Sequence, residues 1–297
     1  MEGGRVMDAL IGAIWTRELW NVGLNLVVVA LGIWYMAATG FRREIRSGRE
    51  PVPPGRKMLF LTGLALFYLA LGSPMEAIGH ELFSVHMLQQ SILYLIVPPL
   101  LIRGIPDWMW RHWLQRTPLR KRAVWGRRPL VTLLLFNGLF SVYHLPRVFD
   151  FLMGDELYQL LSHIVLILTA GLMWWPVLTP LAEERVLQPL KKLAYLAAAG
   201  MLLTPACALI IFSDGLLFAS YEGTRLFPIL SPHNDQQLGG VVMKIIQEIA
   251  YGTGMGHVFL QWVRQEGKKN MYGVPDEPVP MPSVEFNGGN LEREDLK

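Results

Sequence analysis

The chain has a single cysteine, Cys207, among its 297 residues. One thiol excludes an internal disulfide, a CxxC redox pair and a cluster of thiolates around a metal. The metal-binding spacing HExxH is absent as well. Any metal site in this chain must therefore use histidine, methionine or carboxylate side chains gathered from separate segments.

Charged residues are also scarce, at 17% of the chain, whereas hydrophobic residues make up 52%. Soluble domains usually carry about a quarter charged residues, so this composition is typical of a membrane protein. A membrane-spanning helix needs about 20 mostly apolar residues. The sequence predicts an all-α integral membrane protein, a bundle of seven transmembrane helices at 19–40, 57–73, 82–102, 129–143, 157–179, 192–212 and 238–262.

The start of the chain lacks a basic region followed by a short apolar core and a small-residue cleavage site. We therefore do not expect a removed signal peptide there. Residues 1–18 are expected to form an extracytoplasmic N-terminal segment, and residues 19–262 the seven-helix membrane domain. Residues 263–297 contain four prolines and a Gly-Gly pair, which predicts a disordered cytoplasmic tail.

Basic residues alternate between the predicted loops. The first loop holds six Lys and Arg residues, the third holds eight and the fifth three, whereas each even-numbered loop holds at most one. Cytoplasmic loops carry an excess of Lys and Arg, so the N-terminus is predicted outside and the C-terminus in the cytoplasm. The third loop also carries Trp108, Trp110, Trp113 and Trp125. Such a loop is typical of an amphipathic segment on the inner leaflet, and we expect no nucleic-acid partner.

The third predicted span is polar at its outer end. His86 and Gln90 are four residues apart and share one face of a helix, and Tyr94 continues that face. Polar side chains in a spanning helix are costly, so they usually face a bundle interior, a cavity or a partner. Two interpretations stay open: hydrogen bonds to neighbouring helices, or His86 as a ligand at an outward-facing site. Near the inner end, Pro98 and Pro99 cannot donate backbone hydrogen bonds, which predicts a bent or loosened helix.

The histidines gather on the predicted outer side, which has five of the seven: His80, His86, His144, His163 and His233. The third, fourth and fifth spans each bring one to their outer ends. Three imidazoles from three helices suit Cu(I), Cu(II) or Zn(II). Thioethers favour Cu(I), and three methionines lie near the same level, although methionines in a bundle more often serve packing: Met75, Met87 and Met153.

The last predicted span contains a second polar group. Lys244 and Glu248 are four residues apart, a spacing that suits an ion pair and lowers the cost of burial. The simplest interpretation is a brace between helices; the alternative is a transport path. Gly239 and Gly240 let another helix approach closely. A retinal pigment is excluded, because Lys244 lies near the outer end and the third span has no acidic counter-ion.

Several motifs, taken in order, resemble the CtaG family of multi-span membrane proteins associated with cytochrome c oxidase assembly. They are HMLQQ with PPLLIRGIP (86–106), YHLPRVFD (143–150), His163 before MWWP (173–176) and DQQLGG (235–240). The resemblance covers about residues 55–262 and concerns the seven-span family, not the single-span copper-delivery protein of the same name. It implies a non-enzymatic assembly factor that handles copper on the outer side. The family's polar positions fall on His86, His144, His163, Asp235 and Gln236.

One departure from the family pattern concerns the third span. Many relatives have a second histidine four residues after the first, where this chain has Gln90. An amide is a poor ligand for Cu(I), so copper must be bound by residues from several helices, through His80, His144 or His163.

We therefore expect a plasma-membrane assembly factor that binds Cu(I) transiently and passes it to cytochrome c oxidase subunits after delivery by an extracytoplasmic donor. The expected ligands are His86, His144 and His163, with His80 as an outer relay. Asp235 is expected to orient a histidine, as metal-bound imidazoles usually require. Two alternatives are a haem-binding redox protein with histidines as axial ligands and a metal-free transporter or scaffold.

Overall fold

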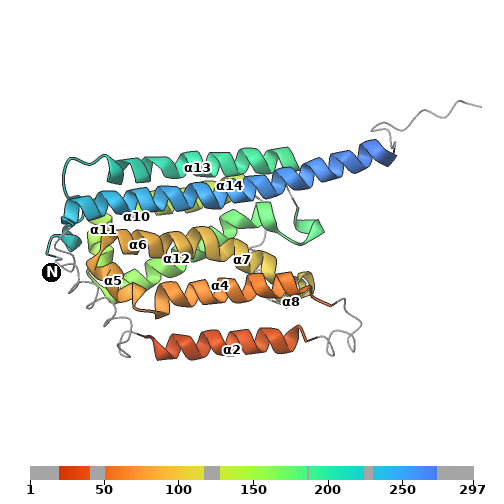
Figure 1. Ribbon diagram of the computed structural model, residues 1–297, viewed down its shortest axis with the longest axis horizontal. Helices are drawn as coiled ribbons and strands as arrows, with labels where there is room; N and C mark the ends of the chain where they lie inside the picture. Colours follow the sequence, from red (N-terminus) through yellow and green to blue (C-terminus); the bar gives the residue numbers. More distant parts are fainter. Residues whose placement is uncertain (1–19, 41–50, 117–127, 186, 224–229, 273–297) are drawn as a thin grey trace, which may run out of the picture.

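The computed structural model describes residues 20–40, 51–116, 128–185, 187–223 and 230–272. Every regular element in these ranges is a helix, and the long helices run side by side as an elongated bundle (Figure 1). Helices α5 (Met75–Glu81) and α11 (Pro146–Met153) lie at one end of the bundle, and α8 (Asp107–Arg116) lies at the other. Helix α2 (Val22–Ala38) lies along α4 (Pro54–Gly72) at the edge.

A helix occurs at each of the seven predicted positions. The first two positions are occupied by α2 and α4. The third is a continuous helical stretch made of α6 (Phe83–Ser91), the π-helix η2 (Ile92–Ile96) and α7 (Val97–Gly104). The last four are α10 (Pro129–Tyr143), α12 (Glu156–Leu178), α13 (Pro189–Ile211) and α14 (Pro232–Tyr272). Two short 3-10 helices, η3 (Ala182–Glu184) and η4 (Ala219–Tyr221), lie in the connections. The all-helical class is therefore confirmed.

The number of spans rests on length and composition. In the described part of the chain, four helices are long and apolar enough to cross a membrane, and a fifth span results if the bent pair α10–α11 counts as one. Helix α2 is apolar but shorter, with 17 residues. The predicted total of seven spans and the orientation of the termini thus remain predictions.

Several predicted features lie outside the described residues. These are the N-terminal segment 1–18, the basic positions within 41–50 and 117–127, Trp125, the single basic residue of the sixth loop (Arg225) and the tail beyond Tyr272. Helix α14 continues ten residues past the predicted end of the last span, through Tyr272. The first part of the segment 263–297 is therefore helical.

The predicted loosening before Pro98 is confirmed. Proline has no N–H, so Pro98 and Pro99 cannot bond to the carbonyls one turn earlier. The helix widens before these prolines into the π-helical turn Ile92–Ile96. In this turn the N–H of Val97 donates to the carbonyl of Ile92, five residues back. A π-helical turn rotates the residues before it relative to those after it, and such turns occur frequently at functional sites. Here the turn follows the segment that carries His86.

A break also separates α10 from α11. The two helices are bent by 78° across a short connection that starts with His144. Pro146 lies in the first turn of α11, where its missing N–H has no intrahelical partner to lose. The break holds His144 and the aromatic residues on either side of it at the end of the bundle.

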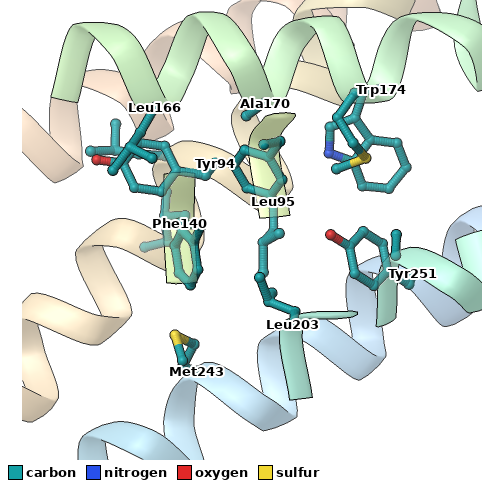
Figure 2. Packing of buried hydrophobic residues seen from close by; sticks show 14 of the residues in the cluster. Tyr94, Leu95, Phe140, Leu166, Ala170, Trp174, Leu203, Met243 and Tyr251 are labelled. Carbon is teal, nitrogen blue, oxygen red and sulfur yellow. The ribbon is translucent and has the colours of Figure 1, made fainter. Parts of the chain in front are cut away.

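The main core is aromatic and apolar and occupies the space between α6–α7, α10, α12, α13 and α14 (Figure 2). Tyr94, Phe140 and Trp174 are among its fully buried side chains. Gly239 and Gly240 allow the close approach that the sequence predicts. A Cβ on Gly239 would lie 2.6 Å from the ring of Phe83 in α6, and one on Gly240 would lie 2.8 Å from Ile211 in α13. Helix α14 therefore packs tightly against two neighbours.

A smaller apolar cluster joins α2, α4 and α8. The rings of Tyr35 and Phe60 stack at 3.9 Å between centroids, and the hydroxyl of Tyr35 donates to the carbonyl of Gly104. Trp113 of α8 stacks on Trp34 of α2. Helix α8, from the loop predicted to be interfacial, thus packs its tryptophans against the bundle while Arg111 and His112 remain exposed.

Candidate functional site

His86 lies on α6 with 1% of its surface exposed. Its Nε2 is 3.1 Å from the hydroxyl of Tyr143 and 2.8 Å from the side-chain nitrogen of Gln90. The amide oxygen of Gln90 has no hydrogen-bond partner among the described residues. The bond to His86 persists if the amide is turned over. The amide nitrogen donates to an unprotonated Nε2, whereas the amide oxygen accepts from a protonated Nε2. The face predicted for His86 and Gln90 is therefore turned into the bundle.

His163 faces His86 from α12. The two imidazole centroids are 6.5 Å apart. Nδ1 of His163 lies 2.6 Å from the hydroxyl of Tyr94, a short and buried hydrogen bond. Its Nε2 is buried and has no hydrogen-bond partner within the described ranges. An orphaned, buried nitrogen on a fixed ring is what a ligand-binding histidine requires.

His144 lies at the end of α10, fully buried. Its Nδ1 is 2.7 Å from the carbonyl of Phe140. A carbonyl only accepts, so Nδ1 carries the proton and Nε2 keeps its lone pair. That Nε2 also has no hydrogen-bond partner in the described part of the chain. The ring of Tyr143 lies 5.2 Å from His144 and 6.5 Å from His86, so this tyrosine lies beside both histidines.

The structure thus brings His86 and His163 into direct proximity, with His144 next to them across Tyr143. It does not assemble a ready-made polydentate site. Among the described residues, no three His, Cys, Asp or Glu side chains are grouped closely enough to hold a metal ion. The site as it stands is a pair of imidazoles with a third nearby.

A pocket of about 640 Å³ lies beside His163 and Tyr94. His80, the expected outer relay, lines it from α5 and lies 3.4 Å from the side-chain nitrogen of Gln159. Two carboxylates, Glu76 and Glu156, line the same pocket. Burial raises the pKa of the Glu76 carboxyl above its ordinary value. The pocket therefore places acidic and imidazole side chains next to the histidine pair.

A family model described as the cytochrome c oxidase caa3 assembly factor (Caa3_CtaG) matches residues 33–265, which include every site residue above. The chain belongs to the CtaG family. The printed description of this family names an assembly factor for cytochrome c oxidase caa3.

Relatives of this CtaG chain occur in mycobacteria. An uncharacterized protein of Mycobacterium leprae is 24% identical over 284 residues, covering 87% of this chain and 39% of the relative. An uncharacterized protein of Mycobacterium bovis is 24% identical over 267 residues, covering 82% and 39% respectively. The chain thus spans about two-fifths of the length of these relatives. No solved structure matches the chain.

Asp235, one of the polar CtaG positions, makes no direct hydrogen bond to a histidine among the described residues. It accepts hydrogen bonds from the backbone N–H of Phe83 at 2.6 Å, from the N–H of Ser84 and from the Ser84 hydroxyl at 2.5 Å. The first N–H groups of a helix have no intrahelical partner, so a carboxylate is favoured there. Asp235 therefore caps α6 from α14 and acts on His86 through the backbone.

Gln236, the next CtaG position, braces the connection between α13 and α14. Its Oε1 accepts from the N–H of Leu217 at 2.7 Å, and its Nε2 donates to the Ser213 hydroxyl at 2.8 Å. His233 contacts the same connection, with Nε2 3.0 Å from the carbonyl of Ser213. Through these bonds both side chains tie the start of α14 to the connection after α13, and neither bond reaches the histidine pair.

The predicted ion pair on α14 is present. Lys244 Nζ is 2.7 Å from Glu248 Oε1 and also donates to the hydroxyl of Thr204 on α13 at 2.9 Å. The Glu248 side chain is 61% exposed, so the pair lies on the surface of the bundle. Gln247, one residue before Glu248, is fully buried and donates to the carbonyl of Gly200. This arrangement favours the brace between helices over an internal transport path.

Three site residues carry no assigned role in the sequence analysis: Tyr94, Tyr143 and Glu76. Tyr94 has a signal, because it continues the His86–Gln90 face. Tyr143 directly precedes His144, and only the turn after α10 brings its hydroxyl to His86. Of the three methionines near the same level, Met87 packs beside Gly239, and Met75 and Met153 pack on the apolar core.

Proposed function

We propose that this chain assists copper insertion into cytochrome c oxidase by binding Cu(I) transiently between His86 and His163. The observation that carries the proposal is the facing imidazole pair, with ring centroids 6.5 Å apart and a buried His163 nitrogen without a hydrogen bond in the described structure. Copper is cargo in this account, and the protein is an assembly factor rather than an enzyme.

The donor set suits a cuprous ion. Imidazole binds copper well, and the single cysteine, Cys207, lies elsewhere, on α13. Metal–imidazole bonds are about 2 Å long, so two nitrogens bound to one ion lie about 4 Å apart. The rings of His86 and His163 are close enough to meet this spacing after small rotations. His144, whose Nε2 keeps its lone pair, supplies a third ligand if α10 and α12 approach further.

Hydrogen bonds fix the ligands and keep the binding reversible. Tyr94 holds His163 by Nδ1, which leaves Nε2 for the ion. Nε2 of His86 is bonded to Tyr143 and Gln90, so an ion that binds this nitrogen displaces a hydrogen bond. On release the hydrogen bond forms again. This exchange weakens binding relative to a site with free donors, as transfer to the oxidase requires.

The pocket beside His163 gives the ion a route. Glu76, Glu156 and His80 line it, and the two carboxylates attract a cation toward the buried pair. The proposed order is capture in the pocket, transfer past His80 to His163 and His86, and ligand exchange to an oxidase subunit. In this account the pocket faces the outside of the plasma membrane, where a copper donor protein supplies the ion, and the chain spans the bilayer seven times.

The test is complementation of a strain that lacks this gene, with His86→Ala, His163→Ala and His144→Ala variants. The expected result is loss of oxidase activity and of oxidase copper for the first two, and a partial loss for His144→Ala, at unchanged levels of variant protein in the membrane. His233→Ala, which removes a histidine outside the pair, is the matched control and retains activity. Unchanged oxidase assembly and copper content in His86→Ala would contradict the proposal.

A visible absorption spectrum of the purified protein separates this proposal from the haem alternative. The copper account expects no Soret band. A Soret band lost in His86→Ala or His163→Ala would replace it with haem binding.

A further inference from the structure

A second pocket, of about 620 Å³, includes Asp107 of α8, a helix at the end of the bundle opposite α5 and α11 (Figure 1). Helices α4, α7, α8, α12, α13 and α14 and the segment after α12 contribute to its wall. Its lining includes five basic side chains, each from a different segment of the chain: Arg56, Arg103, Arg185, Lys192 and Arg264. None of these five side chains lines the pocket beside His163.

Positive charge in this pocket is largely unbalanced. Among the described residues that line it, Asp107 carries the one carboxylate, and Arg56 pairs with it at 2.7 Å. Lys192 Nζ donates to the carbonyl of Val177, and Arg185 donates to that of Pro180. A carbonyl satisfies a donor but cancels no charge.

The remaining two arginines are less engaged. Arg103 and Arg264 have no side-chain hydrogen bond or ion pair with any residue that the structure describes. Arg103 is half-buried at the end of α7, where an unpaired guanidinium is costly. Like charges that share one pocket repel, and screening over this range is incomplete at physiological salt.

The general excess of Lys and Arg on the cytoplasmic side explains why basic residues occur at this end of the bundle. It does not explain why five of them from separate segments surround one pocket. Exposed positions such as Lys191, one residue before Lys192 and outside the pocket lining, satisfy the charge rule equally well.

We propose that this pocket binds a phosphate-bearing anion, either the headgroup of an anionic membrane lipid or a free phosphate compound. Arginine forks match phosphate oxygens in pairs, and Lys192 adds a point charge. Thr179 and Gln261 offer further donors in the same lining. The apolar side chains of Leu178, Leu187 and Val258 line the pocket as well, and they suit the start of an acyl chain. Basic pockets between spanning helices at the cytoplasmic side are known sites for lipid headgroups.

The experiment measures thermal unfolding and retained phospholipid of the full purified chain. The protein is placed in nanodiscs with or without phosphatidylglycerol in phosphatidylcholine, and in detergent with or without inorganic phosphate. We expect stabilisation by phosphatidylglycerol and retention of this lipid through purification. Stabilisation by inorganic phosphate in delipidated detergent, without preferential lipid retention, assigns the site to a free phosphate compound.

Lys192→Gln and Arg264→Gln each remove one charge from the pocket, and Lys191→Gln removes the neighbouring charge as the control. Each pocket variant is expected to bind the phosphate-bearing ligand roughly tenfold more weakly than the unaltered chain does. This is the factor expected for the loss of one charge-assisted hydrogen bond. Arg264 is exposed, so its replacement leaves the fold intact. The proposal would be overturned if nanodiscs of phosphatidylcholine alone stabilised the protein as much as those with phosphatidylglycerol. It would also be overturned if phosphatidylglycerol and inorganic phosphate stabilised Arg264→Gln, Lys191→Gln and the unaltered chain equally. Copper binding is measured in parallel and is expected to be unchanged.

Discussion

The carboxylate of Asp235 accepts a hydrogen bond of 2.6 Å from the backbone N–H of Phe83, a residue 152 positions earlier in the chain. This bond ties the start of α6 to the start of α14. Because His86 lies within the first turn of α6, the position of its imidazole depends on a residue of the last helix. The polar motif of α14 thus supports the site without touching it.

Asp235→Ala is expected to destabilise the protein by about 1–2 kcal/mol, the usual cost of losing a helix-capping side chain. It is also expected to lower copper retention, because α6 loses its anchor. Thermal unfolding and copper analysis of the purified variant measure the two effects. Asp150→Ala is the matched control, since Asp150 makes the same kind of bonds to the N–H groups of Ala219 and Ser220, at the start of η4. An Asp235→Ala variant that behaves like Asp150→Ala in copper retention argues against this coupling.

Tyr94→Phe is expected to cost about 1–3 kcal/mol, because it leaves Nδ1 of the buried His163 ring without its partner. Copper retention falls as well, since the ring loses the bond that fixes its orientation. Tyr195→Phe removes a buried hydroxyl that donates to the carbonyl of Met173, away from the histidines. This control is expected to lose stability while retaining copper. Equal copper retention in both variants contradicts the orienting role of Tyr94.

Gly239→Val is expected to destabilise the protein by about 1–3 kcal/mol through overpacking. The new side chain collides with Phe83 and Met87 on α6, where even a Cβ lies 2.6 Å from the Phe83 ring. Gly252→Val on the same helix has open space around its Cβ and serves as the control. Chemical or thermal unfolding of the two variants in one detergent provides the comparison. Similar losses at both positions exclude close packing of α14 on α6 as the cause.

The stability of the protein is expected to depend on pH through Glu76. Burial raises the pKa of this carboxyl above its ordinary value of 4.5, so the native protein binds its proton more tightly than the unfolded chain does. The resulting stabilisation is fully present at low pH and is lost as the pH rises through the native pKa. Glu76→Gln stays neutral and does not show this loss. The variant should therefore gain melting temperature relative to the unaltered chain as the pH rises.

The groups that share the pocket with Glu76 are His80, Glu156 and His163, and they are left unchanged in this comparison. Glu222→Gln, which alters an exposed carboxylate, is the control. The comparison is the difference in melting temperature between Glu76→Gln and the unaltered chain. If this difference does not change with pH, Glu76 does not titrate as expected.

The sequence predicts the helices well, because apolar runs and prolines act locally. The bounds of α10 are those predicted, and the loosening before Pro98 follows from two missing N–H groups. The ion pair of Lys244 and Glu248 also follows from helical spacing alone. Helix α14 is longer than predicted because its charged last turns lie beyond the apolar pattern.

The candidate site is predicted only in part, since it depends on the rotation and contact of helices far apart in sequence. The shared face of His86 and Gln90 is visible in the sequence, whereas the partners Tyr143 and Tyr94 follow from how α10 and α12 pack. The cap that Asp235 provides for α6 is not visible in the sequence for the same reason. The sequence around an aspartate looks the same whether its carboxylate caps a helix from another segment or bonds to a histidine.

The most direct test of the copper account is metal analysis of the purified protein after loading with Cu(I) under reducing conditions. We expect stoichiometric copper in the unaltered chain and in His233→Ala. His86→Ala and His163→Ala are expected to bind copper at least about tenfold more weakly, because each loses one ligand of a two-histidine site. Copper absent from the unaltered chain, or bound equally by all four proteins, contradicts a site between His86 and His163.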